Sequence, residues 1–278
     1  MPQTLLSGLT FPEGPRWHDN RLWFSDFYNH RVVAVGLDGK AETMLTVPQI
    51  PSGLGWMPDG SLLVVSMNDK RLLRQVNGAL VMHGDLSGIA GGPCNDMVVD
   101  AQGRAYVGNF GYERFQGEDA RPARLARVDP DGRVSVVADD MLFPNGAVIT
   151  PDGKQLIIGE TMGNRLTAFD ITPDGGLTNR RIFAADPTLF PDGICLDAEG
   201  AIWVADPRGN RAVRVKEGGE ITDTIALPGR NAYACMLGGP DRKTLFICTA
   251  PGSGPTRAGT TDGAIEIVTV QVPGAGLP

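Results

Sequence analysis

Six equivalent positions in a repeated sequence pattern include four side chains with an oxygen suited to a metal ion. Each position lies in a fixed register to a turn glycine, a tryptophan or a proline of its repeat, and the six are Glu13, Ser52, Asn95, Asn145, Asp192 and Ala234. The two carboxylates and two amides among them belong to Glu13, Asn95, Asn145 and Asp192. Hard divalent cations prefer such an all-oxygen set. It favours Ca²⁺, permits Mg²⁺ and Mn²⁺, and suits Zn²⁺ less well, because zinc in proteins mostly binds His or Cys.

The same residue types also have a purely structural explanation. Asn and Asp before glycine are common turn formers, and Asn145 and Asp192 both precede glycine. Glutamate is not a turn former, so Glu13 in the same register favours a metal site. Both explanations remain open from the repeat alone.

The elements that must position these residues repeat about six times along the chain. In each copy a short apolar run precedes a tight turn and a β-rich run follows it, at 22–25, 62–66, 105–108, 156–159, 202–205 and 245–248. Two such runs joined by a tight turn predict a β-hairpin. A third run with a polar–apolar beat follows in four copies, at 31–35, 71–74, 165–169 and 211–215.

Repeats of about 46 residues, each worth three or four strands, are typical of a β-propeller. We therefore predict an all-β fold, a six-bladed β-propeller with four-stranded antiparallel blades around a central channel, forming a single domain over residues 1–278. The alternative is an all-β sandwich with chance similarity among its turns. In a propeller the first strand of each blade lines the channel, so the six equivalent residues should form a ring at one mouth. Residues 1–8 are expected to complete the last blade.

Composition excludes several classes of protein. The chain has 278 residues and a formal charge of −7, which disfavours nucleic acid and anionic membranes as partners. It contains 37 Gly and 21 Pro, consistent with many tight turns. There is no membrane-length apolar run, signal peptide, phosphate loop or nucleophile-elbow motif, so a cytoplasmic location is expected. The four cysteines show no C-x-x-C spacing and are expected to be reduced, buried thiols.

Four segments carry a resemblance to a known family: residues 13–17, 95–104, 144–146 and 191–200. In this order and at these separations they resemble the senescence-marker-protein/gluconolactonase/luciferin-regenerating-enzyme family, over about residues 11–270. The resemblance implies a six-bladed propeller with one catalytic divalent cation, held at Glu13, Asn95, Asn145 and Asp192. It also implies metal-dependent hydrolysis of lactones, with some relatives acting on phosphotriesters.

The expected function is a divalent-metal-dependent hydrolase that opens a lactone to its hydroxy acid. A cation would polarise the carbonyl and activate water, and the resemblance suggests Asp192 as both ligand and general base. Two other carboxylates could act instead of Asp192 as the general base: Asp206, at the end of the next strand, and Glu160, at the matching place one blade earlier. Alternatively, they could support the site without contacting substrate, or could simply be solvated carboxylates at strand ends. The alternative functions are a phosphotriesterase-like hydrolase and a non-catalytic calcium-binding or ligand-binding propeller.

The residues expected around the mouth of the channel predict a substrate less polar than a sugar lactone. Sugar-lactone hydrolases of the family often carry an Arg two residues before the middle ligand, where this chain has Pro93. The side chains expected to contact substrate are mostly apolar or aromatic: Tyr28, Met97, Phe110, Tyr112, Met162 and Tyr233. Two long loops, 110–124 and 251–262, could cover the mouth or could be plain surface. The expected partner is a small lactone or ester, and the oligomeric state is not predicted.

Overall fold

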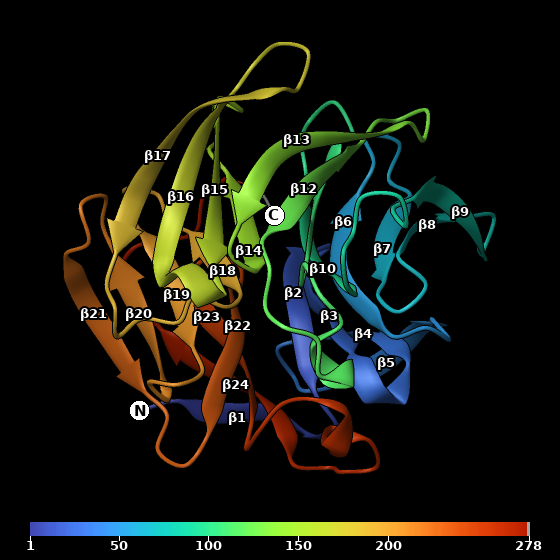
Figure 1. The fold of residues 1–278 in the computed structure, drawn as a ribbon. Coiled ribbons are helices and arrows are strands. Elements are labelled where there is room, and N and C mark those ends of the chain that lie inside the picture. Colours follow the sequence, from blue (N-terminus) through green and yellow to red (C-terminus); the bar gives the residue numbers. More distant parts are fainter. Residues whose placement is uncertain (277–278) are drawn as a thin grey trace.

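The computed structural model describes residues 1–276 as six four-stranded antiparallel sheets. Figure 1 shows these sheets arranged radially around a central channel, which confirms the predicted six-bladed β-propeller. Every β-rich run predicted to follow a turn lies within the second strand of a blade. None of the helical segments within residues 1–276 combines the length and the apolarity needed to cross a bilayer.

Each blade runs from an inner strand at the channel to an outer strand. Blades 1 to 3 consist of β2 (Pro12–His18), β3 (Arg21–Asp26), β4 (Arg31–Val35) and β5 (Ala41–Thr46); β6 (Pro51–Trp56), β7 (Leu62–Ser66), β8 (Arg71–Val76) and β9 (Ala79–Asp85); and β10 (Cys94–Val99), β11 (Ala105–Asn109), β12 (Ala123–Val128) and β13 (Val134–Met141). Blades 4 to 6 consist of β14 (Pro144–Ile149), β15 (Gln155–Glu160), β16 (Arg165–Ile171) and β17 (Leu177–Ala185); β18 (Ile194–Leu196), β19 (Ile202–Asp206), β20 (Arg211–Val215) and β21 (Ile221–Ala226); and β22 (Asn231–Gly238), β23 (Thr244–Ala250), β24 (Gly263–Thr269) and β1 (Gln3–Leu9).

The last blade is closed by the N-terminal strand, as predicted. β1 pairs antiparallel with β24, with Gln3 opposite Ile267 and Leu9 opposite Gly263. Figure 1 shows the blue β1 beside β24. The outer strand of blade 6 comes from the start of the sequence. Backbone hydrogen bonds between the N-terminal and C-terminal parts of the chain therefore close the ring of blades.

Short 3₁₀ turns lie in the loops after the second strand of four blades. They are η1 (Phe27–Asn29), η2 (Arg114–Gln116), η3 (Thr161–Gly163) and η4 (Pro255–Arg257). These loops and the starts of the first strands share one end of the channel, because strands alternate in direction within a blade. The same loops therefore carry the side chains that surround the predicted ring.

Glycines next to the ring allow neighbouring inner strands to approach closely. A Cβ added at Gly53, Gly146 or Gly193 would lie less than 3.0 Å from the backbone of the next blade. Gly146 donates a backbone hydrogen bond to Asp192, and Gly193 donates one to Tyr233. None of these three glycines has a positive φ. They serve inter-blade packing, so the explanation of these Asn-Gly and Asp-Gly pairs as turns is wrong.

Apolar side chains from adjacent blades form the core between them. The four cysteines are buried there as free thiols. Burial raises the pKa of the Cys94 thiol to about 12, so this thiol is protonated and unreactive at neutral pH. The expectation of buried, reduced cysteines is confirmed for the part of the chain that the structure describes.

Candidate metal centre and active site

The strand register identifies the six ring positions and changes one of them. In blades 1 to 5 the residue four places after the ring position pairs with the start of the second strand, as Ile149 pairs with Leu156. In blade 6 the residue paired with Leu245 is Leu237, which makes Tyr233 the ring residue. The β22–β23 hairpin holds one more residue than the β14–β15 hairpin, so alignment of Pro240 on Pro151 wrongly selected Ala234.

The four candidate metal ligands lie together at one mouth of the channel. Glu13, Asn95, Asn145 and Asp192 line one cavity of about 570 Å³. Their exposed fractions are between 4% and 9%. Residues separated in sequence by up to 179 positions are thus brought to one buried polar site by the blade repeat.

Hydrogen bonds fix the orientation of the two amides. The Thr161 hydroxyl donates to the Pro191 carbonyl (2.6 Å) and accepts from Asn145 Nδ2 (3.2 Å). Asn145 Oδ1 is therefore turned toward the ring, where Asn95 Nδ2 donates to it (3.0 Å). The Ser52 hydroxyl in turn donates to Asn95 Oδ1 (3.2 Å). Each amide oxygen keeps a second lone pair for another ligand.

Thr161 and Ser52 were missed as functional residues by the sequence reasoning. Thr161 follows the end of a second strand directly, and this position at the mouth could have identified it. Ser52 occupies a ring position, but its hydroxyl supports an amide rather than offering a carboxylate.

Burial raises the pKa values of both ring carboxylates. Together with the negative charge of Asp192, it raises the pKa of Glu13 well above its usual range. Burial also raises the pKa of Asp192 to about 8, although the Asn145 amide opposes this shift. No Lys or Arg within residues 1–276 forms an ion pair with either carboxylate. A site of this kind is stabilised by a positive charge between the two acids.

The residues present fit a hard divalent cation. No group of three or more His, Cys, Asp or Glu close enough to hold a metal occurs within residues 1–276; the candidate centre combines two carboxylates with two amides instead. All four donors are buried oxygens; Glu13, Asn95 and Asn145 lie on inner strands, and Asp192 lies two residues before the inner strand β18. This donor chemistry matches Ca²⁺ best, with Mg²⁺ or Mn²⁺ as alternatives.

Beneath the ring lies a buried ion pair that the sequence reasoning did not identify. Arg16 donates to Asp96 Oδ1 (2.6 Å) and to the carbonyls of Met97 (2.5 Å) and Leu54 (3.0 Å). The two side chains are only 3% and 8% exposed. Arg16 thereby ties the inner strands of blades 1, 2 and 3 together below the mouth.

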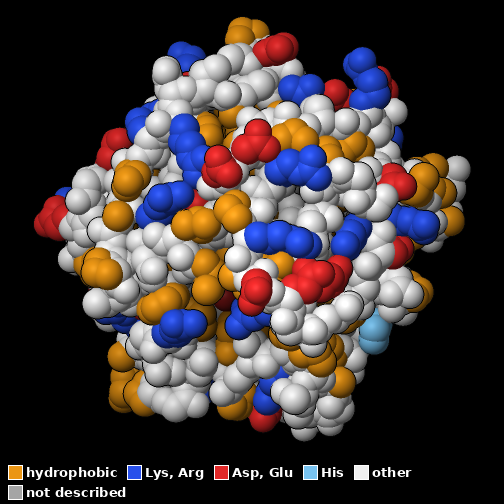
Figure 2. Space-filling model, in the orientation of Figure 1, with side chains coloured by type: hydrophobic (Ala, Val, Ile, Leu, Met, Phe, Trp, Pro, Cys, Tyr) orange, Lys and Arg blue, Asp and Glu red, His pale blue; other side chains and the backbone are white. Residues whose placement is uncertain are grey.

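The cavity walls are largely aromatic and apolar. The rings of Phe110 and Phe143 stack at 4.5 Å, and Phe11 lies 4.6 Å from Tyr233. Four of the six residues expected to contact substrate line this cavity: Tyr28, Phe110, Met162 and Tyr233. Figure 2 shows apolar side chains near the centre of this face, mixed with both basic and acidic ones.

Met97 and Tyr112 do not line the cavity. Met97 is fully buried in the core between blades 2 and 3, where it packs with Leu63 and Val107. Its sequence distance of two from Asn95 is misleading, because the β10–β11 register is irregular between Cys94 and Met97. Tyr112 is 7% exposed and its backbone lies against Gly92, outside the cavity.

Both long loops contribute to the cavity. Phe115 comes from the loop at 110–124, and Ser253 and Gly254 come from the loop at 251–262. A Cβ added at Gly254 would lie 3.1 Å from the Phe115 ring, so the two loops meet beside the cavity. Their mobility as lids stays a prediction.

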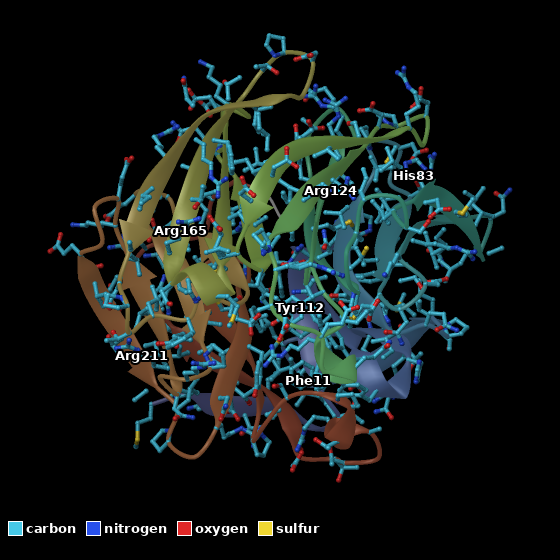
Figure 3. All side chains as sticks on the ribbon, viewed as in Figure 1. Phe11, His83, Tyr112, Arg124, Arg165 and Arg211 are labelled. Carbon is cyan, nitrogen blue, oxygen red and sulfur yellow. The ribbon has the colours of Figure 1, made fainter. Side chains whose placement is uncertain are left out.

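Asp206 and Glu160, the alternative bases, are structural ion-pair partners. With Asp26 they form a series in which a carboxylate ends the second strand and binds the arginine five residues later: Arg31, Arg165 and Arg211. All three carboxylates are fully buried and none lines the cavity. Figure 3 labels Arg165 and Arg211 on neighbouring blades. The expectation of solvated strand ends is wrong, and neither residue can reach a substrate in the cavity.

This series predicts a specific acid sensitivity. Burial alone would raise the pKa of Asp26, but hydrogen bonds from Thr10, Asn29 and Arg31 outweigh it and hold that pKa below its usual range. The stabilisation is present above the unfolded-state pKa and disappears as pH falls through the lower folded-state pKa. Asp26→Asn should therefore reduce the free energy of unfolding most at about pH 6 and least near about pH 3. Urea denaturation at each pH checks this. Asp131→Asn, on an exposed turn, is the control, and an equal pH dependence in both variants would contradict the expectation.

Comparison with known proteins places the chain in a family. Residues 11–251 match the family model described as "SMP-30/Gluconolactonase/LRE-like region". The chain belongs to this family. It is 28% identical to the pentonolactonase XacC of Haloferax volcanii over 96% of this chain and 92% of that protein. Two other curated relatives, the 6-deoxy-6-sulfogluconolactonase of Pseudomonas putida and the regucalcin of Danio rerio, match at 31% identity over only 53% and 54% of their length.

Two solved structures with the same fold have names that refer to different properties, one to lactone hydrolysis and one to calcium binding. A gluconolactonase from Xanthomonas campestris superposes with a TM-score of 0.76 and 26% identity, covering 99% of this chain and 89% of that one. A calcium-binding regucalcin from Agrobacterium tumefaciens gives a TM-score of 0.83 at 22% identity, covering 100% and 96%. The second likeness shows the fold alone.

Proposed function

We propose that this protein is a divalent-metal-dependent lactonase that opens a cyclic ester to its hydroxy acid. The observation that carries the proposal is the buried ring of Glu13, Asn95, Asn145 and Asp192 at the base of a ligand-sized cavity. Membership in a family with named lactonases supports the reaction class. The all-oxygen donor set supports Ca²⁺ as the cation.

The ring residues have different roles in this reaction. Bound in the ring, a divalent cation would act as a Lewis acid toward the lactone carbonyl and lower the pKa of water. Asn95 and Asn145 hold their carbonyl oxygens in place through the hydrogen bonds of Ser52 and Thr161. Asp192 accepts the proton of the attacking water on a carboxylate oxygen. The water oxygen bonds to the carbonyl carbon, the ring C–O bond breaks, and the proton passes to the departing alkoxide.

The cavity supports a substrate with an apolar or aromatic body. Its walls bring together Phe110, Phe143, Phe11 and Tyr233, and Pro93 stands where family sugar-lactonases often carry Arg. Polar side chains outside the ring, such as Asn68, Gln116 and Asn231, also line the cavity, so the argument for an apolar body rests on the aromatic walls and on the missing Arg. We therefore expect an aromatic lactone to be hydrolysed with a higher kcat/KM than gluconolactone. A preference for gluconolactone would contradict this part of the proposal.

Replacing Asn145 tests the metal site without introducing charge. Asn145→Ala removes one donor and leaves Asn95 without its amide partner, so metal affinity should fall by about 10- to 100-fold or more. Calorimetric titration of chelator-stripped protein with Ca²⁺ measures this, and circular dichroism verifies the fold. Asn68→Ala, at an amide that lines the cavity outside the ring, is the matched control. Unchanged metal affinity and turnover in Asn145→Ala would show that the site is misassigned.

A further inference from the structure

Two arginines reach the same cavity from different blades. Arg114 lies in η2, in the loop between β11 and β12 of blade 3. Arg208 follows β19 in blade 5 and precedes β20. Figure 1 shows the green loop that carries η2 at the mouth face, and Figure 2 shows basic side chains near the centre of that face. The two arginines therefore come from the two blades on either side of blade 4, and both line the cavity above the ring.

No side-chain or carbonyl oxygen within residues 1–276 binds either guanidinium directly, although the positive charge of Arg114 opposes the rise in the pKa of Asp192. Within residues 1–276, Arg114 and Arg208 form no ion pair, and their side chains donate no hydrogen bond to the protein. Most other arginines of the propeller are bound to carboxylates or carbonyls, as Arg165 and Arg211 are. The acidic residue beside Arg114, Glu113, is already paired with Lys70 at 2.9 Å.

Aromatic rings position both guanidinium groups. The Arg208 guanidinium carbon lies 4.1 Å from the centre of the Phe190 ring. That of Arg114 lies 5.8 Å from Phe143 and 5.9 Å from Phe115. Stacking occupies the face of a guanidinium and leaves its N–H edge free for an in-plane acceptor. A carboxylate is the planar acceptor that this edge binds best.

The charges of the cavity favour an anionic ligand. Glu13 and Asp192 would be offset by a divalent cation, and Lys70 offsets Glu113. Arg114 and Arg208 then remain as the uncompensated charges at the mouth, although the chain as a whole carries −7. The positive potential is therefore local to the cavity, where it can select a substrate.

We propose that Arg114 and Arg208 form an anion subsite that selects lactones bearing a carboxylate substituent on an apolar or aromatic body. The inference rests on the lactonase function proposed above and names its substrate class. The carboxylate is a substituent that is present before ring opening, as distinct from the carboxylate that hydrolysis creates. The aromatic walls hold the body of the substrate, and the arginines hold its charge while the lactone carbonyl faces the ring.

The test compares two lactones that differ only in charge, phthalide-3-carboxylate and phthalide-3-carboxamide. The wild-type protein should favour the carboxylate, and added salt should reduce that preference. Arg114→Gln and Arg208→Gln should each lower the ratio of the two kcat/KM values by about tenfold. Arg133→Gln, at an exposed turn away from the cavity, should leave the ratio unchanged. An unchanged ratio in both cavity variants would overturn the subsite while leaving the lactonase function standing.

A binding measurement separates failure of the subsite from failure of the proposed function. The non-hydrolysable lactam 3-oxoisoindoline-1-carboxylate is titrated calorimetrically into wild type and both variants, with its carboxamide as the neutral probe. Binding of the carboxylate that weakens about tenfold in each variant supports the subsite even if no lactone is hydrolysed. Equal affinity for carboxylate and carboxamide would overturn it. Hydrolysis of the neutral carboxamide lactone also creates a carboxylate, which can inhibit the enzyme. If the arginine variants changed only this product inhibition, the arginines would bind the carboxylate formed by hydrolysis, and the proposed subsite would be overturned.

Discussion

Asp192→Asn should abolish lactone hydrolysis while leaving the propeller folded. The substitution keeps the shape of the side chain but removes both a charged metal donor and the proposed proton acceptor. Loss of a general base alone lowers the rate by about 10²- to 10⁴-fold. Because Asp192 is also a ligand, the loss in kcat/KM should reach at least the upper part of this range. Initial rates of acid release at saturating Ca²⁺ measure it.

The matched control for this variant is Asp131→Asn, which removes a carboxylate from an exposed turn. Its activity should equal that of the wild type. Retention of more than about one tenth of wild-type kcat/KM in Asp192→Asn, with normal metal binding, would contradict the assignment of Asp192 as base. Glu13 would then be the remaining acidic candidate in the ring.

Asp96→Ala should cause the largest loss of stability among single substitutions near the site. It removes the carboxylate from the buried Arg16–Asp96 pair and leaves the guanidinium charge uncompensated beneath the ring. Breaking such a pair from one side costs about 3–5 kcal/mol. Urea denaturation in the presence of a chelator measures the effect, because bound metal would otherwise add its own stabilisation.

Two further variants make this prediction specific. Asp131→Ala breaks the exposed Arg133–Asp131 pair, whose side chains are 80% and 57% exposed, and should change stability by less than about 1 kcal/mol. Replacement of both buried partners in Arg16→Met/Asp96→Leu should be less destabilising than Asp96→Ala, since no buried charge is left unpaired. A loss in Asp96→Ala as small as in the exposed control would contradict a structural role for the buried pair.

The register of the repeats predicted the fold and most of the ring because both depend on local turn chemistry. Gly60, Gly103, Gly153 and Gly200 mark the turn in four blades, and counting back from each reaches the true ring residue. The count failed only in blade 6, where an additional hairpin residue moves the ring position to Tyr233. Such a local irregularity in strand pairing is set by packing and is not encoded in the turn residues.

The sequence pattern could not predict the contacts between loops and blades. Nothing in the repeat places Thr161 under Asn145, or Arg16 across three blades, since these contacts depend on how blades pack. The same holds for Met97, which is close to Asn95 in sequence yet lies in the core. The carboxylate of Asp206 matched the chemistry of a base, but its ion pair with Arg211 became apparent only from the fold.

The most direct test of the central claim is metal-restored lactone hydrolysis by chelator-stripped protein. Acid release is followed from gluconolactone, an alkyl γ-lactone and phthalide, each with and without Ca²⁺, Mg²⁺, Mn²⁺ and Zn²⁺. The account predicts no turnover without metal, restoration by Ca²⁺ or another oxygen-preferring cation, and the highest kcat/KM on the aromatic lactone. Full activity after complete metal removal would contradict it. Tight Ca²⁺ binding without hydrolysis of any lactone would also contradict it and would direct attention to phosphotriesters and then to a non-catalytic calcium-binding role.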